Sequence, residues 1–314
     1  MQVHRDIHNL PLFTNAVITI GTFDGVHCGH LQIIKQLKEE AGNIKGESVI
    51  ITFDPHPRMI ITSDKSEIKL LNTLAEKLEL LRNQDIDHVV VVPFTKEFSE
   101  QSAKGYIENF LVKTFHPHTI IIGYDHHFGS HRSGNYKLLE AYAGQNNYTV
   151  KEIPEHVLQH VVISSTKIRE AVMKGDIETA NNFLGYEYFF EGTIVPGNKI
   201  GRTIGYPTAN IVIQDKNKLI PGDGIYAAEV TINDRNNKLK GMMSIGIRPT
   251  IGISERTIEV NIFDFNEDIY EKKIRVYVKK YIRKEKEFNG LEELKSAIAK
   301  DKIEALKYYK ECDH

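Results

Sequence analysis

Two histidines, His27 and His30, stand close together just after a short apolar run. Gly21 and Gly25 precede them, and glycine lets the backbone approach a ligand closely. A helical pattern begins at about Gly29, and the first turn of a helix presents backbone N–H groups and a partial positive charge. The two imidazoles at this helix start can donate further hydrogen bonds to phosphate oxygens. The stretch therefore predicts an anion-binding site.

Two other interpretations of the histidine pair are open from the residues alone. His27 and His30 can be ordinary, partly exposed side chains, although their position between a glycine turn and a helix start favours a ligand site. A metal site is disfavoured, because no acidic or thiolate partner stands at helical spacing from them. The chain also lacks a GxxxxGKS/T phosphate-binding loop, so a nucleotide must be held in another way.

A second candidate site is the glycine-rich stretch GNKIGRTIGYPTANI, residues 197–211. Its glycines, together with Lys199 or Arg202, can form a loop that covers phosphate groups. Thr208 and Asn210 place two neutral oxygens on the same face of an extended segment. Mg²⁺ accepts such oxygen ligands and takes its other ligands from water and substrate phosphates. The alternative is a glycine-rich turn that leads into a strand, and these residues alone do not decide between the two.

The first half of the chain alternates short runs rich in Val and Ile with amphipathic helical stretches. Such apolar runs are typical of parallel strands covered on both faces, and their order predicts a doubly wound parallel sheet. Ligands of such sheets bind beyond the carboxyl ends of the strands, which is where the histidine pair stands. The predicted strands are Ala16–Ile20, Ser48–Phe53, His88–Val92 and Thr119–Ile122, and the predicted helices are Leu31–Ala41 with Gly42 as its stop, Thr73–Gln84 and Ala103–Thr114.

After about Gly185 the pattern changes. The runs GIYAAEVTI, TIEVNIFDF and KIRVYVKKYI alternate apolar and polar residues, and turn signals such as PGDG and NDRNN fall between such runs. This pattern predicts a small antiparallel β-barrel, and the stretch LEELKSAIAKDKIEALKYYK predicts a closing helix. A helical pair around Lys167–Leu184 precedes the change, so the predicted domains are residues 1–184 and 185–314.

The composition limits the function classes. The chain has 314 residues with 41% hydrophobic and 26% charged residues, as expected for two globular domains. Its formal net charge is −2, so it has no general field for a nucleic acid, and the basic run at residues 279–286 indicates a solvated strand and turn. Two cysteines, no membrane-spanning run and no signal-peptide pattern predict a cytoplasmic protein without a membrane partner. A weak homo-oligomer is left open.

Four motifs in the first half carry a resemblance to a known family. GTFDGVHCGH resembles the HxGH signature of the nucleotidyltransferase superfamily, in the form found in bacterial bifunctional riboflavin kinase/FAD synthetases. FDPHPR, GYDHHFG and ISSTKIR are similar to further motifs of the adenylyltransferase module of that family, and they follow in the same order. The resemblance implies a Rossmann-like fold that adenylates FMN to FAD with ATP.

The resemblance also implies roles for individual residues. His27 and His30 would stabilise the ATP phosphates as pyrophosphate leaves. Ser165, Thr166 and Arg169 would clamp the same phosphates with hydroxyl donors at a helix start and a forked cation one turn later. Capping of that helix by the two hydroxyls is compatible with this role. The other nucleotide- or flavin-binding residues that the resemblance implies are Gly21, Phe23, Asp24, Gly25 and Asp125.

The second half resembles riboflavin kinases. GRTIGYPTAN is similar to the GRxxGxPTAN motif of that family, and the similarity continues through PGDGIYAAEV, SIGIRPT and RTIEVNIFDF to YIRKEKEFNGLEEL. It implies that Thr208 and Asn210 hold Mg²⁺ and ATP phosphate. The ATP-binding loop that it implies contains Gly197, Lys199, Gly201 and Arg202.

Glu259 is the general base that this resemblance implies. Ile258, Val260 and Ile262 share one face of a period-two strand, and Glu259 points to the other face. A carboxylate there can accept the proton of the riboflavin 5′-hydroxyl as it attacks the γ-phosphate of ATP. The alternative is a solvated residue on the outer face of the strand.

The sequence departs from the family pattern at four positions. His126 and His127 stand where the family commonly has Phe and a variable residue, which leaves the flavin contact open. Ser244 replaces a common Asn, with modest consequences expected. Cys28 fills the variable position of the HxGH motif, where we expect it to be inert.

The sequence therefore predicts a bifunctional enzyme. Its C-terminal module phosphorylates riboflavin to FMN, its N-terminal module adenylates FMN to FAD, and ATP and Mg²⁺ serve both steps. One rival is a superfamily enzyme that acts on another phosphorylated substrate, and the barrel motifs argue against it. The other is a flavin-sensing or regulatory protein, including one that acts on RNA, which lost the chemistry; the intact site residues argue against this.

Overall fold

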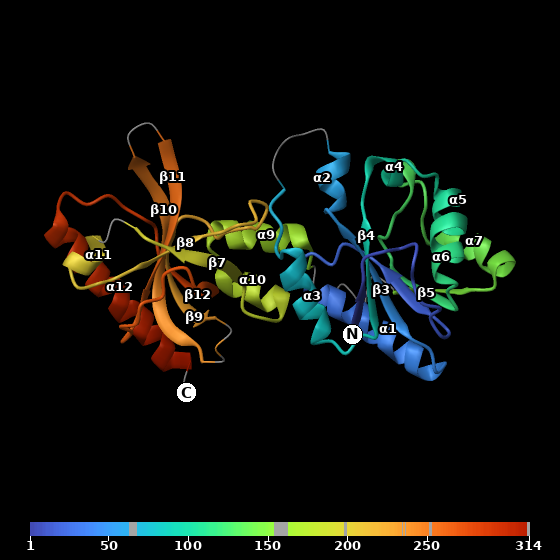
Figure 1. Ribbon diagram of the computed structural model, residues 1–314, viewed down its shortest axis with the longest axis horizontal. Coiled ribbons are helices and arrows are strands. Elements are labelled where there is room, and N and C mark those ends of the chain that lie inside the picture. The colour runs from blue at the N-terminus through green and yellow to red at the C-terminus, as the bar shows by residue number, and fades with distance from the viewer. Residues whose placement is uncertain are drawn as a thin grey trace. The chain divides into compact units, whose positions relative to one another are not determined.

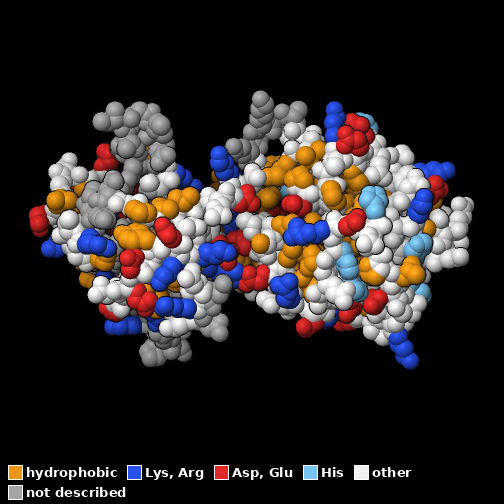
Figure 2. Space-filling model, viewed as in Figure 1, with side chains coloured by type: hydrophobic (Ala, Val, Ile, Leu, Met, Phe, Trp, Pro, Cys, Tyr) orange, Lys and Arg blue, Asp and Glu red, His pale blue; other side chains and the backbone are white. Residues whose placement is uncertain are grey.

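The computed structural model describes residues 1–62, 68–153, 163–197, 200–233, 235, 237–250 and 253–312. The chain forms two compact units, Met1–Ser165 and Thr166–His314. Among the described residues, no helix is both long enough and apolar enough to cross a membrane. On the face drawn in Figure 2, basic and acidic side chains are interspersed over both units.

A six-stranded parallel sheet forms the centre of the first unit, as predicted (Figure 1). Its strand order is β1-β4-β3-β2-β5-β6, so the chain leaves β2 toward β3 on one side and returns to β5 on the other. The topological switch therefore lies between β2 and β5, where sheets of this kind bind ligands. The strands are β1 (Gln2–His4), β2 (Val17–Ile20), β3 (Ser48–Asp54), β4 (His88–Pro93), β5 (Thr119–Gly123) and β6 (Thr149–Ile153).

Helices cover both faces of this sheet (Figure 1). On one face, Ile34 and Leu37 of α1 (Cys28–Asn43) and Leu78 of α3 (Leu74–Arg82) pack in one apolar cluster with strand residues. The other face is covered by the helical segment after residue 102 and by α7 (Tyr136–Asn146). Every residue of β2 is buried, which explains why its sequence is apolar apart from Thr19. The short helices are α2 (Pro57–Ile61) and α4 (Lys96–Ser99).

Two helix predictions need correction. The predicted stop at Gly42 is wrong, because α1 continues to Asn43 and the left-handed residue is Lys45, with φ of 52°. The predicted helix Ala103–Thr114 is helical, but its middle has the wider winding of a π-helix, a form that often occurs at functional sites. Its parts are α5 (Ala103–Gly105), η1 (Tyr106–Val112) and α6 (Lys113–Phe115).

The second unit contains a closed six-stranded barrel, which confirms the predicted small antiparallel barrel. Its strand order is β10-β11-β8-β7-β12-β9, and all neighbouring pairs among the described residues are antiparallel. The strands are β7 (Phe189–Val195), β8 (Ala209–Val212), β9 (Gly224–Ile232), β10 (Leu239–Thr250), β11 (Ile253–Ile262) and β12 (Lys273–Arg283). The helices are α9 (Ser165–Lys174), α10 (Ile177–Leu184), α11 (Ile200–Thr203) and α12 (Leu291–Cys312).

The closing helix α12 packs on the outer surface of the barrel. Its residues Ala305 and Tyr309 form an apolar cluster with Ala227 of β9 and Met242 of β10. The Tyr309 hydroxyl lies 2.7 Å from the carbonyl oxygen of Ala228 and 2.9 Å from that of Gly241. The inner face of the barrel is apolar, because alternate strand residues such as Met243, Ile245, Val260 and Val276 are fully buried.

The helix α10 packs against β12, so the helical pair belongs to the compact unit that contains the barrel. The Asn181 side chain donates to the Val278 carbonyl at 3.2 Å and accepts from the Tyr188 N–H at 2.7 Å. The predicted boundary after residue 184 coincides with the end of α10, where Gly185 has φ of 79°. That boundary stays a prediction of where the two functional domains meet.

Candidate active sites

The loop between β2 and α1 is a strained turn. Phe23, with φ of 48°, and Val26, with φ of 36°, are in the left-handed region, and Gly25 has φ of 90°. A β-branched residue such as Val26 is a genuine outlier there, and strain of this kind clusters at functional sites. Gly21 gives space to the Phe23 ring, because a Cβ at Gly21 would lie 3.1 Å from Phe23 Cε2. The Phe23 ring in turn packs against the His30 ring, with 5.0 Å between their centroids.

His27 and His30 cap the N-terminus of α1 reciprocally. The His30 N–H donates to His27 Nδ1 at 3.4 Å, and the His27 N–H donates to His30 Nδ1 at 3.3 Å. The two rings stack with their centroids 3.7 Å apart. Since each Nδ1 accepts a hydrogen bond, each neutral ring carries its proton on Nε2. The pair thus combines helix capping with two Nε2–H donors beside a helix N-terminus.

His30 is a neutral imidazole at physiological pH. Burial lowers its pKa well below the usual range, and the positive charges of His27 and Lys77 act in the same direction. A neutral ring keeps the Nδ1 lone pair that the cap uses, whereas a protonated ring would donate from both nitrogens. The local charges therefore stabilise the tautomer that the capping geometry requires.

Ser165 and Asp24 connect the histidine loop to the rest of the first unit. The Ser165 hydroxyl donates to the Asp24 carbonyl oxygen at 2.9 Å. The buried Asp24 carboxylate accepts from the N–H groups of Leu71 at 3.0 Å and Asn72 at 3.2 Å. Asp24 therefore uses its carboxylate within the protein, and its predicted nucleotide contact stays a prediction.

The other residues predicted for this site are less enclosed. Asp125 is exposed and follows β5, the strand beside β2. On α9, Thr166 is exposed and Arg169 is half-buried. Their predicted contacts with nucleotide or flavin stay predictions.

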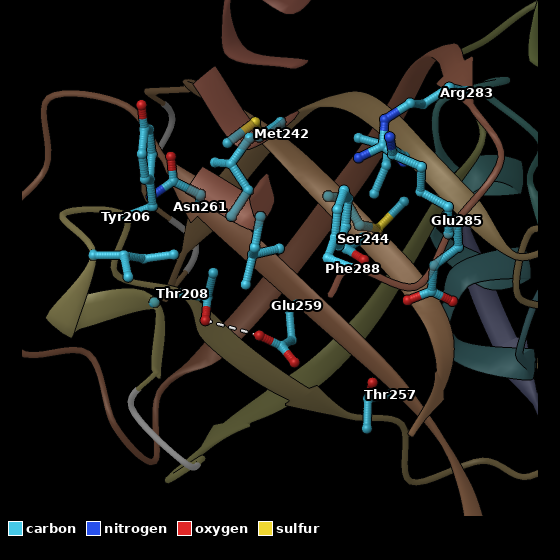
Figure 3. Close-up of a pocket in the computed structure, with 17 residues that line it drawn as sticks. Tyr206, Thr208, Met242, Ser244, Thr257, Glu259, Asn261, Arg283, Glu285 and Phe288 are labelled. Atoms are coloured by element: carbon cyan, nitrogen blue, oxygen red, sulfur yellow. Dashed lines mark hydrogen bonds between the residues drawn. The ribbon is translucent and has the colours of Figure 1, made fainter. Parts of the chain in front are cut away.

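The second candidate site is a cavity of about 260 Å³ between the outer face of the barrel and α12 (Figure 3). Glu259 lies on this outer face, as the alternation of β11 predicts. Its side chain lines the cavity. The lining also includes Gly201, Tyr206, Thr208, Met242, Ser244, Asn261, Phe288 and Ile298. The cavity therefore combines polar groups from the strands with an apolar wall.

Thr208, Asn210 and Glu259 come together as the sequence predicts. The Thr208 hydroxyl donates to Glu259 Oε2 at 2.9 Å, the contact drawn as a dashed line in Figure 3. Asn210 of β8 pairs in register with Glu259 of β11, so the two side chains project from the same face. Ser244 pairs with Glu259 from the opposite side, in β10.

The described part of the glycine-rich stretch forms the short helix α11, a tight turn and the start of β8. A Cβ at Gly201 would lie 2.2 Å from the Tyr206 carbonyl oxygen, so this turn requires glycine. Gly197 lies against the Asn210 side chain, and Arg202 is exposed. Lys199 lies outside the described residues. The predicted phosphate contacts of this loop stay predictions.

Two family models match the chain. The model described as FAD synthetase matches residues 11–167, and the model described as riboflavin kinase matches residues 184–309. A bifunctional riboflavin kinase/FMN adenylyltransferase of Listeria monocytogenes is 36% identical over 94% of this chain and 93% of its own length. One of Buchnera aphidicola from Schizaphis graminum is 38% identical over 98% of this chain and 99% of its own length. The chain belongs to the bifunctional riboflavin kinase/FMN adenylyltransferase family.

A solved structure shares this fold along the whole chain. It is a Streptococcus pneumoniae protein described as a macrolide-efflux protein, with a TM-score of 0.85 and 28% identity, and the match covers 96% of this chain and 97% of that chain. Family membership confirms the resemblance carried by the sequence motifs. All predicted site residues except Arg169 lie within the regions that the two family models match.

Lys77 is a buried residue of the first unit that the sequence analysis missed. Its side chain lies in α3, the residue is only 6% exposed, and Nζ donates to Thr52 Oγ1 at 3.2 Å. Burial lowers the pKa of Lys77, while the carboxylates of Asp24 and Asp54 act in the opposite direction. A lysine within an amphipathic helix ordinarily indicates a solvated face, so its sequence position gave no signal.

Asn261 is a residue of the barrel site that the sequence analysis missed. Its Nδ2 donates to the Pro207 carbonyl oxygen at 2.6 Å, which fixes the residue before Thr208. Asn261 and Glu259 are two positions apart on β11, so they share one face. The signal available in the sequence was a polar residue two positions after Glu259, the predicted base.

A buried ion pair anchors the segment between β12 and α12. Arg283 Nε and Nη2 donate to the two carboxylate oxygens of Asp301, each at 2.7 Å, and Asp301 is only 4% exposed. The anchored segment contributes Glu285, Lys286 and Phe288 to the cavity lining. The sequence motif for this region indicated its family but not this contact.

Proposed function

We propose that this chain converts riboflavin to FAD in two ATP-dependent steps. The C-terminal barrel phosphorylates the 5′-hydroxyl of riboflavin and gives FMN and ADP. The N-terminal unit transfers AMP from a second ATP to FMN and gives FAD and pyrophosphate. The observation that carries the proposal is the hydrogen-bonded pair of Thr208 and Glu259 in a cavity, with Asn210 paired in register beside Glu259, in a chain from this family.

In the kinase step, Glu259 accepts the proton of the riboflavin hydroxyl. The hydroxyl oxygen attacks the γ-phosphorus of ATP, a new P–O bond forms, and the bond to the leaving ADP oxygen breaks. The Thr208 hydroxyl orients the carboxylate through one oxygen. A carboxylate accepts several hydrogen bonds at once, so this contact is compatible with a substrate hydroxyl. The apolar residues Met242 and Phe288 offer surface for the flavin ring.

Thr208 and Asn210 are the proposed Mg²⁺ ligands. A hydroxyl and a side-chain amide oxygen are hard donors, and a site of this type takes its remaining ligands from water and phosphate. Among the described residues there is no group of three or more His, Cys, Asp or Glu side chains that could hold a metal. Bound Mg²⁺ would neutralise phosphate charge, and Glu259 beside these two residues would receive the proton.

In the adenylyl-transfer step, a phosphate oxygen of FMN attacks the α-phosphorus of ATP and pyrophosphate leaves. His27 and His30 donate from Nε2–H to phosphate oxygens, and the N-terminus of α1 adds a partial positive charge. Ser165, Thr166 and Arg169 are the proposed further phosphate contacts.

The expected cytoplasmic location and the expected lack of nucleic-acid and membrane partners stay predictions, and weak homo-oligomerisation is still open.

The test is a product assay. The full chain is incubated with riboflavin, ATP and Mg²⁺, and riboflavin, FMN and FAD are resolved by chromatography. We expect FMN to form first and FAD to follow, with both dependent on Mg²⁺. Formation of FMN without FAD would favour an N-terminal unit that transfers AMP to an acceptor other than FMN. Formation of neither product would favour a regulatory protein.

A further inference from the structure

The ammonium of Lys77 is connected to the histidine loop by two successive hydrogen bonds. Lys77 Nζ donates to Thr52 Oγ1 at 3.2 Å, and the Thr52 hydroxyl donates to the Thr22 carbonyl oxygen at 3.1 Å. Thr52 is fully buried in β3, and Lys77 is nearly so. Thr22 directly precedes Phe23, the strained residue whose ring packs against His30. Lys77 is therefore linked to the loop at the point where its backbone becomes strained.

A second contact ties the same loop to the region of Lys77. The Asp24 carboxylate accepts from the backbone N–H groups of Leu71 and Asn72, shortly before the helix that carries Lys77. Asp24 and Asp54 are the two carboxylates whose charge favours the Lys77 ammonium. The Asp24 carboxylate therefore ties the loop by hydrogen bonds to the segment before α3, and its negative charge favours the Lys77 ammonium on α3.

The positive charge of Lys77 also acts on His30. Burial is the main cause that lowers the pKa of His30, and among the described residues the charges of His27, from the same cap, and of Lys77, from α3, act in the same direction. The Phe23 ring packs against the His30 ring. A second positive charge on His30 is disfavoured beside the ammonium. Protonation of His30 would also remove the Nδ1 acceptor of the cap. The positive charge of Lys77 therefore favours the neutral His30 ring, whose Nδ1 acceptor keeps the cap and with it the orientation of both Nε2–H donors.

We propose that Lys77 is a positioning residue of the adenylyl-transfer site, which holds the histidine loop through Thr52 and acts on the cap of His27 and His30 with its positive charge. This inference rests on the proposed transfer of AMP to FMN in the N-terminal unit. The alternative is a buried lysine that only completes the packing of α3 against the sheet.

The test compares three variants of the full chain. Lys77→Arg keeps the charge, Lys77→Gln keeps a hydrogen-bond donor without the charge, and Lys77→Met removes both. The His30 ring is titrated by NMR, and FAD formation from supplied FMN is measured between pH 5.5 and 8.5. Thermal unfolding of the N-terminal unit and riboflavin phosphorylation are recorded on each preparation.

We expect the pKa of His30 to rise by about 1 unit or more in the Gln and Met variants, as when a like charge is removed. Burial, the largest cause, still lowers that pKa in these two variants, so the acid side of their pH profile of FAD formation should move to higher pH by the same amount as the His30 pKa. The Arg variant should keep the profile of the parent. A His30 titration that is the same in Gln and Met variants as in the parent would overturn the inference. A parent that forms no FAD would overturn the proposed function instead, and the NMR titration would still decide the role of Lys77.

If Lys77→Met lowers the unfolding temperature of the N-terminal unit so far that it is not folded, the Gln variant decides. A folded Gln variant with the parent pH profile would show that the charge has no role. A folded Gln variant with a raised His30 pKa would support the proposal without the Met variant.

Discussion

The Thr208 hydroxyl donates to the Glu259 carboxylate at 2.9 Å, although 51 residues separate the two in the chain. The contact joins the residue just before β8 to the middle of β11 and fixes one oxygen of the proposed base. Asn210, two residues after Thr208, stands opposite Glu259 in the strand register. The site therefore depends on barrel closure, because β8 and β11 are neighbours only in the folded barrel.

Glu259→Gln should abolish most of the kinase activity. Gln preserves the size of the side chain and can still accept from Thr208, but it cannot take the hydroxyl proton. We expect FMN formation to fall by about 10²–10⁴ in single-turnover measurements. FAD formation from supplied FMN, on the same preparation, should be unchanged. A kinase rate within threefold of the parent would reject the base assignment, and equal loss of both activities would indicate a global folding defect.

His30→Ala should affect the other reaction. The substitution removes an Nε2–H donor and one half of the cap of α1. We expect FAD formation to fall by about 10²–10³, as for loss of one preorganised donor to a charged transition state. Riboflavin phosphorylation should stay within twofold of the parent. The matched control is His8→Ala, an exposed histidine, which should leave both rates unchanged; normal FAD synthesis by His30→Ala would contradict the proposed role.

The sequence predicted the features that depend on local pattern. Continuous Val and Ile runs indicated the inner parallel strands, and period-two alternation placed Glu259 opposite Ile258 and Val260. The edge strands β1 and β6 were missed because they lack such a run. A wider helical winding between Tyr106 and Val112 was also missed, because an apolar pattern does not separate α from π winding over two turns.

The parts of the sites that could not be predicted depend on contacts between distant elements. Lys77 has the position of a solvated lysine on its helix, and only the fold buries it beside β3. Arg283 and Asp301 likewise stand in ordinary charged stretches, and only the packing of α12 on the barrel joins them. The motifs located both sites, but the residues that support them were visible only in the structure.

Asn261→Ala should loosen the turn that positions Thr208. The substitution removes the 2.6 Å hydrogen bond from Asn261 Nδ2 to the carbonyl oxygen of the exposed Pro207. We expect a loss of about 0.5–1.5 kcal/mol in the free energy of unfolding, the usual range for one hydrogen bond. We also expect kcat/KM for FMN formation to fall about tenfold, which corresponds to roughly 1.4 kcal/mol. Both are measured by denaturant titration and steady-state kinetics.

Ser244→Ala is the matched control for that change. Ser244 lines the same cavity and pairs in register with Glu259. Glu259, however, accepts a hydrogen bond from Thr208, which the change at Ser244 leaves in place. We expect its effect on the free energy of unfolding to stay within about 0.5 kcal/mol. An Asn261→Ala variant that behaves like this control would show that the Pro207 contact has no part in the site.

The kinase unit should fold alone when the fragment includes the helical pair before the barrel. Asn181 bridges α10 to β12 and to Tyr188, and the Gly222 N–H donates to the Val172 carbonyl of α9 at 3.2 Å. Leu184 is fully buried as well. A fragment that begins at residue 166 keeps these contacts, and a fragment that begins at residue 186 loses them.

We therefore expect residues 166–314 to phosphorylate riboflavin at a rate near that of the full chain. Residues 186–314 should be less stable by at least about 2–4 kcal/mol, since Leu184, other buried apolar side chains of α9 and α10 and two or more hydrogen bonds are lost. Circular dichroism during thermal unfolding gives the stability, and FMN formation gives the activity. Equal stability of the two fragments would show that the helical pair does not support the barrel. A folded but inactive longer fragment would show that residues before 166 take part in the kinase reaction, because the barrel would then have every contact described above and still lack a group that the chemistry needs.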